Sequence, residues 1–436
     1  MHLTFRSTCR ACGSSALTPV LDLGPQYLQG SFVMEGKPLP PMRRIPTALV
    51  RCDPSRDEKA CGLVQMVCSV PPEILYSVYW YRSGTNETMR RHLASVVSDA
   101  MSTLGRTPLR VLDIGCNDGT LLRNYPAEVV QFGCDPSDAV LGCEPTVHVV
   151  QETFPSRTLQ RAAGEQPFDI VTSIAMFYDL EDPVDFVRNI KALLAPGGVW
   201  IFEVAYLPLT LELNSYDTIC HEHLEYYSLA VIERIVAAGG MKVRRAALNS
   251  INGGSIRVFV THEEDHPVGD DTFRRELTDL RHREFERELE TDLPYELFKA
   301  RVSNAVRSLT SLVTHLRDQG KTIHIYGAST KGNTILQACG LDKSHIAYAA
   351  DRNPDKDGAR TLGTNIPIIS EERSRAMKPD YYLVLPWHFR TEFLKREQPM
   401  IDAGTGMIFP LPVVELITKD GSHSWDPLTS RLARNI

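Results

Sequence analysis

The segment 110–119, which reads RVLDIGCNDG, constrains the fold of this chain more than any other stretch. Its first half is a short apolar run rich in β-branched residues, and its second half is glycine and small polar residues. This pattern predicts a buried parallel strand that ends in a tight turn. Gly115 and Gly119 would let the backbone approach a ligand, and Asp113 could accept hydrogen bonds from a cationic amino-acid group. We therefore interpret the segment as a cofactor-binding loop that includes Asn117.

A second acid follows at the end of the next predicted strand. Asp135 comes after a short apolar run, at the position where doubly wound folds hold a carboxylate against ribose hydroxyls. The first loop has the form D-x-G-x-x-x-G and lacks the G-x-G-x-x-G fingerprint, which favours S-adenosylmethionine over NAD. Strands and helices then alternate, as expected for a parallel α/β sheet. Strands are expected near 110–114, 130–134, 146–150, 168–174 and 199–203.

These two loops resemble the first two motifs of class I methyltransferases, and 193–199 resembles the start of their fifth strand. The resemblance implies that Thr153 and Phe154, after the third strand, face the adenine ring. It also implies that the turn after the fourth strand, which begins at Ala175 and includes Tyr178, lies where the cofactor and substrate pockets meet.

Composition excludes several classes of protein. At 436 residues the chain is too long for one core, so two or three domains are expected. A net charge of −7 gives no electrostatic case for binding nucleic acid. The N-terminus has no apolar signal segment and no apolar run is long enough to span a bilayer, so we expect a cytoplasmic protein with no membrane partner. Ten cysteines in such a protein are more typical of metal binding and buried thiols than of disulfides.

Two cysteine pairs near the N-terminus predict a zinc site. Cys9 and Cys12 form a C-x2-C knuckle, and structural zinc needs four thiolate or imidazole ligands. Cys52 and Cys61 are the best candidates for the remaining two, since the polar loop between them could bulge outward. Cys68 is a weaker candidate because it lies in an apolar run, where a thiol packs in the core. The alternative is a lobe that has lost its metal and packs these cysteines as free thiols.

The segment 216–228 contains His221, Glu222 and His223 in a row. An H-x-H spacing is not that of a helical zinc site, so acid–base chemistry is the better interpretation. A neutral imidazole can take up a proton near neutral pH, and a neighbouring carboxylate can fix its tautomer. The alternative is a histidine pair that satisfies polar groups at a domain seam.

Aromatic residues cluster in 76–84, just before a predicted helix. This segment leads into the cofactor domain, where aromatic side chains can shape a pocket and hydrogen bond to a polyol. Tyr79 and Tyr81 could serve in this way, or they could pack in the core.

The last third of the chain repeats the pattern of a strand followed by a glycine turn. Residues 270–320 are predicted to form long charged helices with one buried apolar face. Strands are then expected near 322–326, 346–350 and 381–385, which predicts a second Rossmann-like unit. Its G-A-S-T-K-G turn lacks the full dinucleotide fingerprint, so NAD binding is not expected.

Five segments together resemble the nucleotide-sugar C-methyltransferases of deoxysugar biosynthesis. These segments are the N-terminal cysteine lobe, the loop 110–119, the H-E-H stretch, 252–257 and 326–332. They follow one another in the same order as in that family, over nearly the whole chain. The resemblance implies S-adenosylmethionine and structural zinc as cofactors and a nucleotide-sugar with a 4-keto group as substrate.

In that family, a histidine at the position of His223 is implied to be the base that removes the proton next to the 4-keto group, with Glu222 beside it. The resulting enolate attacks the methyl group of S-adenosylmethionine, normally at C3. Tyr79 and Tyr81 fall where the family has pocket tyrosines. Lys331, at the start of a helix, could meet a phosphate of the nucleotide, or it could be a surface lysine.

Two residues depart from the family pattern. Cys220 stands where the family often has tyrosine, and Asp179 where it often has histidine, so groups expected around the sugar are altered. A differently substituted sugar is the simplest interpretation, because the base and the cofactor loop are kept. The alternative function is a nucleotide-sugar-binding protein, or an epimerase-like enzyme, that retains the cofactor fold without methyl transfer.

We therefore predict an α/β protein with three parts. Residues 1–72 form a small zinc-binding lobe, 73–268 a class I methyltransferase Rossmann-like domain, and 269–436 a helical linker and a second, C-terminal Rossmann-like domain that helps to bind the nucleotide-sugar. Proline and glycine between the cysteine pairs predict irregular structure in the lobe, whose thin core needs the metal.

Overall fold

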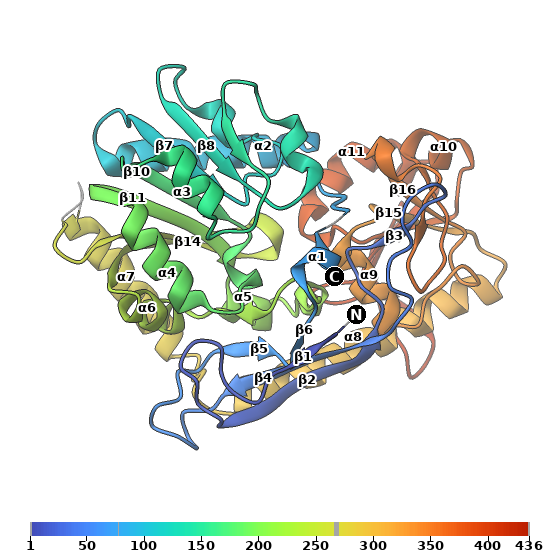
Figure 1. The fold of residues 1–436 in the computed structure, drawn as a ribbon. Helices are drawn as coiled ribbons and strands as arrows, with labels where there is room; N and C mark the ends of the chain where they lie inside the picture. Colours follow the sequence, from blue (N-terminus) through green and yellow to red (C-terminus); the bar gives the residue numbers. More distant parts are fainter. Residues whose placement is uncertain (1, 77, 266–269, 435–436) are drawn as a thin grey trace.

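The computed structural model describes residues 2–76, 78–265 and 270–434. Two large sheets with helices on their faces lie side by side, and a smaller β lobe packs below them (Figure 1). The predicted α/β fold with an N-terminal lobe and two Rossmann-like units is confirmed. The predicted boundary between 268 and 269 lies outside the described residues. No described helix is long and apolar enough to cross a lipid bilayer.

The central sheet has the strand order β13-β14-β11-β10-β7-β8-β9. Its parallel strands are β7 (Arg110–Ile114), β8 (Val130–Cys134), β9 (His148–Val150), β10 (Phe168–Ile174) and β11 (Leu194–Ala205), and its antiparallel strands are β13 (Met241–Asn249) and β14 (Ser255–His262). The parallel strands lie where the sequence predicts them. The chain passes from β7 to β8 and β9 on one side and then to β10 and β11 on the other. The carboxyl end of β7 is therefore the switch point at which sheets of this type bind ligands.

Helices cover both faces of the central sheet. They are α2 (Glu87–Leu104), α3 (Arg157–Ala163), α4 (Pro183–Leu193), α5 (Leu207–Glu212) and α6 (Leu229–Ala238). Helix α2 begins where the Asn86 side chain accepts a hydrogen bond from the backbone of the first turn, at 2.9 Å. Its apolar stripe, which includes Leu93, Val96 and Val97, is buried. The helical spacing in the sequence thus predicts this face correctly.

Three strands of the N-terminal lobe form a four-stranded antiparallel sheet with β12 of the central domain. The prediction of irregular structure between the cysteine pairs is confirmed for 34–44, which has no strand, and is wrong for 17–26 and 45–52. Strand β2 (Leu17–Gln26) pairs with β4 (Ile45–Cys52), β4 with β5 (Val64–Met66), and β5 with β12 (Glu225–Tyr226) of the central domain. Burial alternates along most of β4, as in a strand with one face on a core. Register shifts in β2 fall at Pro19 and Pro25, because proline donates no hydrogen bond to the ladder. Proline therefore shifts these strands locally without preventing them.

Helix α7 (Asp270–Phe285) packs against β13 and α6 of the central domain (Figure 1). The C-terminal unit follows with α8 (Leu293–Asp318), whose predicted apolar face is buried at Val302, Leu309 and Val313. Its sheet has the order β18-β16-β15-β19-β20-β21-β22-β23. The strands are β15 (Ile323–Tyr326), β16 (Tyr348–Asp351), β18 (Ile368–Ser370), β19 (Tyr381–Val384), β20 (Gly406–Phe409), β21 (Glu415–Thr418), β22 (Gly421–Asp426) and β23 (Arg431–Arg434). The helices are α9 (Thr330–Ala338), α10 (Glu371–Ala376) and α11 (Arg390–Asp402), and short elements elsewhere are β1 (Thr4–Phe5), β3 (Phe32–Val33), β6 (Cys68–Ser69), β17 (Arg360–Thr361) and α1 (Pro72–Leu75).

The three parts of the molecule meet at the segment 216–223. Asn333 on α9 donates a hydrogen bond to the carbonyl oxygen of Gln29 in the lobe, at 2.7 Å. Trp387 of the C-terminal unit donates its indole N–H to Asp217 across 2.8 Å. The H-E-H stretch is therefore held between the lobe and the C-terminal unit.

Candidate active site

A cavity of about 560 Å³ lies at the carboxyl ends of β7, β8 and β10, between the central domain and the C-terminal unit. It is lined by loops of the central sheet, the aromatic segment 76–81, the H-E-H stretch, the start of α9 and the turn 385–389. The predicted site residues that line it are Tyr79, Tyr81, Asp113, Gly115, Asn117, Asp135, Thr153, Phe154, Ala175, Tyr178, Glu222, His223 and Lys331. The structure thus brings most of the predicted cofactor and substrate residues to one cavity.

Gly119 and Cys220 were predicted to contact ligands, but neither lines this cavity. A Cβ atom at Gly119 would lie 3.0 Å from the sulfur of Cys143, so this glycine serves the packing of the turn. Cys220 is fully buried, and burial, with the charge of Glu222, raises the pKa of its thiol well above its ordinary value. We therefore place both residues behind the cavity and treat the Cys220 thiol as protonated.

The cofactor loop is shaped by the acid at the end of β8. The backbone N–H of Asn117, at φ +50°, donates to Asp135 Oδ2 across 3.0 Å, and that of Ser137 donates to Oδ1 across 2.8 Å. At Gly115, with φ +75°, a Cβ atom would lie 3.0 Å from the side chain of Met176. The carboxylate that the sequence assigns to ribose therefore also holds the first loop in place.

Acidic side chains dominate the part of the cavity next to this loop. Asp113 accepts a hydrogen bond from Thr172 Oγ1 across 2.6 Å. Burial raises the pKa of Asp113 to about 7, and the charge of Asp135 adds to the rise, whereas the hydrogen bond from Thr172 lowers this pKa. Among the described residues that line the cavity there is no arginine and one lysine. A cavity of this sign suits S-adenosylmethionine, whose sulfonium and α-ammonium groups are positive.

A buried ionic network below the cofactor loop was not predicted from the sequence. Glu203, at the end of β11, accepts hydrogen bonds from His92 Nε2 at 2.6 Å and from Arg257 Nε at 3.0 Å. Burial would raise the pKa of Glu203, but the two basic partners, His92 first, lower it below its ordinary value. Glu203 and His92 both line the cavity. The place of Glu203 at a strand end is visible in the sequence, but its partners come from α2 and β14, which only the fold brings together.

His223 presents a neutral imidazole to the cavity. Its Nδ1 atom lies 2.9 Å from the carbonyl oxygen of Thr218, which can only accept, so Nδ1 carries the proton and Nε2 the free lone pair. The sequence assigned this orienting role to Glu222, but the Thr218 carbonyl performs it. The ring of Tyr178 packs on the imidazole with centroids 4.2 Å apart. Burial, followed by the positive charge of Lys331, lowers the pKa of His223 to about 3.

The other two residues of the H-E-H stretch have different surroundings. His221 is buried, with Nε2 3.2 Å from Thr47 Oγ1 and 3.3 Å from the carbonyl oxygen of Ile45 in the lobe. The interpretation of a histidine that satisfies polar groups at a domain seam therefore describes His221. Glu222 lines the cavity instead, and burial raises its pKa to about 7.

Lys331 and two tyrosines border the part of the cavity near the C-terminal unit. Lys331 Nζ donates to the carbonyl oxygen of Asn252 across 2.6 Å, and burial lowers the pKa of this lysine. Tyr81 is 46% exposed at the rim, and its carbonyl oxygen accepts a hydrogen bond from Asn117 Nδ2 across 3.2 Å. Tyr79 lines the same cavity. The aromatic segment is therefore attached directly to the cofactor loop.

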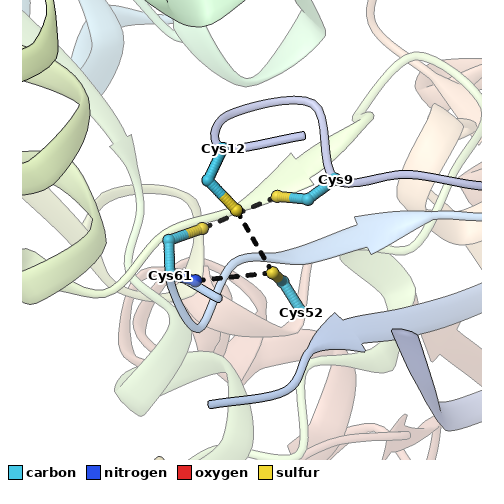
Figure 2. A group of neighbouring side chains, drawn as sticks. All are labelled: Cys9, Cys12, Cys52 and Cys61. Carbon is cyan, nitrogen blue, oxygen red and sulfur yellow. Dashed lines mark hydrogen bonds between the residues drawn. The ribbon is translucent and has the colours of Figure 1, made fainter. Parts of the chain in front are cut away.

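Four cysteine thiols gather in the N-terminal lobe (Figure 2). The sulfur atoms of Cys9, Cys12, Cys52 and Cys61 all lie within 4.8 Å of one another, with 3.6 Å between Cys9 and Cys61 and 3.5 Å between Cys12 and Cys52. Ligands at a Zn–S distance of about 2.3 Å stand about 3.8 Å apart in a tetrahedron, so the cluster fits a zinc ion. Cys68 is buried in an apolar cluster elsewhere. Structural zinc is therefore confirmed as a cofactor, and these four thiols are arranged to hold it.

Family descriptions match three successive parts of the chain. They are "Putative zinc binding domain" over 9–76, "Methyltransferase domain" over 86–246 and "C-methyltransferase C-terminal domain" over 250–412. These matches confirm the three-part organisation that the five sequence segments predicted.

Individual proteins match the chain to different extents. It is 28% identical to the C-methyltransferase NovU of Streptomyces niveus. The alignment runs over 422 residues and covers 95% of this chain and 97% of that protein. It is 36% identical to the tRNA U34 carboxymethyltransferase of Pseudoalteromonas translucida (strain TAC 125). This alignment runs over 108 residues and covers 23% of this chain and 32% of that protein. One similar solved structure is that of magnesium protoporphyrin IX methyltransferase from Synechocystis PCC 6803 with bound SAH, which is 18% identical in sequence. The superposition covers 41% of this chain and 88% of that chain. Its TM-score is 0.31, too low to support a conclusion.

Proposed function

We propose that the acceptor of the methyl group is a carbon atom of a nucleotide-linked 4-keto sugar. The chain is a methyltransferase and a homologue of the C-methyltransferases. The proposed carbon is the one next to the ketone, C3 by resemblance to the deoxysugar enzymes. A carbon next to a ketone must lose a proton before it can accept a methyl group. The site must therefore offer a base to the acceptor.

His223 is the proposed base, and its free Nε2 lone pair in the shared cavity is the observation that carries the proposal. The imidazole is neutral, held in one tautomer by Thr218 and packed against Tyr178. A positioned general base contributes about 10²- to 10⁴-fold to a rate. Glu222, also on the cavity wall, is proposed to stabilise the imidazolium that forms.

The cofactor loop is proposed to hold S-adenosylmethionine next to the base. When bound, S-adenosylmethionine supplies an electrophilic methyl group. Asp135 is proposed to accept hydrogen bonds from the ribose hydroxyls, and Asp113 to face the positively charged amino-acid end; both line the cavity. Thr153 and Phe154, on the same wall, are proposed to contact the adenine ring.

The start of α9 is proposed to bind the diphosphate of the nucleotide. Lys331 lies in the first turn of this helix, where backbone N–H groups and the helix dipole favour an anion. It is the lysine of the cavity wall, and it lies on the C-terminal unit, across from the cofactor loop. A sugar attached to a diphosphate held here would extend toward His223.

The test is product analysis with a panel of nucleotide-linked 4-keto-6-deoxysugars and S-adenosylmethionine that carries a ¹³C-labelled methyl group. The expected product gains one methyl group whose ¹³C signal couples to a ring carbon. A methyl group attached to oxygen, or no product from any sugar while S-adenosylmethionine binds, would contradict the proposal.

A further inference from the structure

Asp179 stands beside the proposed base. It ends the short 3-10 helix Phe177–Asp179 that follows β10. The backbone N–H of Leu224 donates to the carbonyl oxygen of Tyr178 across 2.8 Å, so the chain at 178–179 runs next to the chain at 223–224. The rings of Tyr178 and His223, tilted at 53° to each other, pack at the same contact. Asp179 and His223 therefore approach one cavity from two hydrogen-bonded segments.

The carboxyl group of Asp179 is enclosed by acids and phenols. Its Oδ2 accepts a hydrogen bond from the Tyr76 hydroxyl across 3.1 Å, and its buried Oδ1 has no partner among the described residues. No ion pair joins Asp179 to a basic side chain in the part of the chain that the structure describes. The titratable groups that interact electrostatically with it are Tyr76, Tyr79, Tyr178, Tyr226, Tyr227, Cys220, Glu222 and Glu225.

These surroundings favour a neutral acid at this position. Burial, followed by the negative charge of Glu222, raises the pKa of Asp179 well above its ordinary value, against the hydrogen bond from Tyr76. Two carboxyl groups without a cation between them do not both ionise. The side-chain hydrogen bond with Cys220 favours the ionised form of Glu222. We therefore assign the shared proton to Asp179, on Oδ1, which has no partner among the described residues, because Oδ2 already accepts a hydrogen bond from Tyr76.

We propose that Asp179 is a second catalytic residue, which donates a hydrogen bond from its carboxyl group to the ketone oxygen of the substrate while His223 removes the proton from the neighbouring carbon. This inference rests on the proposed function and adds an acid to its base. Enolisation needs one group without a proton, to act as the base, and one group with a proton, to act as the acid, and the surroundings of such a pair favour these opposite states. A neutral carboxylic acid can stabilise an enolate by hydrogen bonding.

The bonds and electrons of the step balance within the site. The carbon–hydrogen bond breaks and its proton moves to His223 Nε2. The electron pair of that bond forms the carbon–carbon double bond, and the carbonyl π electrons move to oxygen, where the Asp179 proton is shared or transferred. The electron pair of the carbon–carbon double bond would then form the new bond to the methyl carbon, while the sulfur–methyl bond breaks and its electron pair stays on sulfur, which would leave as S-adenosylhomocysteine. The carbonyl is restored and the shared proton goes back to Asp179. The proton on His223 then leaves to water.

The experiment compares Asp179→Ala with Asp179→Asn in two assays. The first is exchange of the sugar C–H for solvent deuterium with S-adenosylhomocysteine present, which reports enolisation without methyl transfer. The second is methyl transfer itself. Asparagine keeps a donor at this position without an ionisable group, so Asp179→Asn should stay within about tenfold of the unchanged enzyme, whereas Asp179→Ala should lose about 10²- to 10³-fold in both assays. Equal losses in both variants would overturn the proposal and indicate an ionised carboxylate that binds a cationic substituent of the sugar.

A third measurement needs no substrate and separates this inference from the proposed function. Burial raises the pKa of Glu225 to about 8, so this residue also contributes a protonated carboxyl group at pH 8. The difference between the infrared spectra of the unchanged protein and Asp179→Asn at pH 8 should therefore contain the carbonyl stretch of one further protonated carboxyl group. Absence of that band would overturn the role of Asp179 and leave methyl transfer by His223 standing. A band without exchange or methyl transfer on any 4-keto sugar would instead overturn the proposed function, and the catalytic role of Asp179 with it.

Discussion

The Nδ1 atom of His223 and the carbonyl oxygen of Thr218 are 2.9 Å apart, and this contact determines which nitrogen of the ring can act as a base. The same carbonyl oxygen also accepts a hydrogen bond from the Tyr226 hydroxyl, at 3.2 Å. The orientation of the imidazole is therefore set by the main chain. Changing Glu222 should leave the ring in place, whereas changing His223 removes the base itself.

Replacing His223 by glutamine should reduce kcat by about 10²- to 10⁴-fold, because the substituted side chain cannot accept the proton. The affinity for S-adenosylmethionine, measured by calorimetry, should change by less than about threefold, since the proposed cofactor contacts lie on other loops. His221→Gln is the matched control. It should lower the melting temperature through its contacts with Thr47 and Ile45 but retain most of kcat. A His223→Gln enzyme with more than a tenth of the original rate would exclude this residue as the base.

Replacing Lys331 by methionine should change both substrate affinity and pH dependence. Hydrogen bonds to charged groups contribute about 1.5–3 kcal/mol, so KM for the nucleotide-sugar should rise about ten- to a hundredfold. Lys331 also helps to keep the pKa of His223 low, so its removal should raise that pKa and move the acidic limb of the kcat/KM profile to higher pH. The exposed Lys343→Met is the control and should change neither quantity. An acidic limb that stays in place would show that Lys331 does not act on His223.

Replacing Cys12 by serine should remove zinc, as measured by elemental analysis after dialysis, and should lower the melting temperature. Loss of a residue that only supports a zinc ligand costs about 10- to 100-fold in metal affinity, so loss of a ligand should cost more. Cys68→Ser is the control, because Cys68 is buried outside the cluster of four thiols. Equal zinc loss in the two variants would mean that both substitutions act through the folding of the lobe, and would contradict a specific role of Cys12 as a ligand.

The cofactor side of the site could be predicted because its signals are local. The strand 110–114, the glycine turn after it and Asp135 at the end of the next strand follow from short patterns and from the rule that ligands bind at strand carboxyl ends. Gly119 shows the limit of this reasoning. Its positive φ fits the same turn, but its free side faces Cys143, and a turn glycine by itself does not indicate which side meets the ligand.

The substrate side depends on contacts that no short pattern records. The orientation of His223 comes from a main-chain carbonyl, and the burial of Cys220 comes from packing between three parts of the chain. Proline residues obscure the strands of the lobe in the sequence, although burial alternates along most of 45–52. The pairing of β5 with β12 joins residues far apart in sequence and could be seen only in the fold.

The closeness of Gly30 to Glu222 offers a test of how the lobe shapes the substrate pocket. A Cβ atom at Gly30 would lie 1.7 Å from Glu222 Oε1, so Gly30→Ala must displace that carboxyl group. Overpacking of this kind costs about 1–3 kcal/mol, and kcat/KM for the sugar should fall about tenfold while affinity for S-adenosylmethionine is kept. In a Glu222→Ala background the methyl group would meet no carboxylate, so Gly30→Ala should cause little further loss, and the two effects should not add. Equal losses in both backgrounds would mean that Gly30 acts on the lobe itself and that Glu222 does not transmit its effect to the substrate.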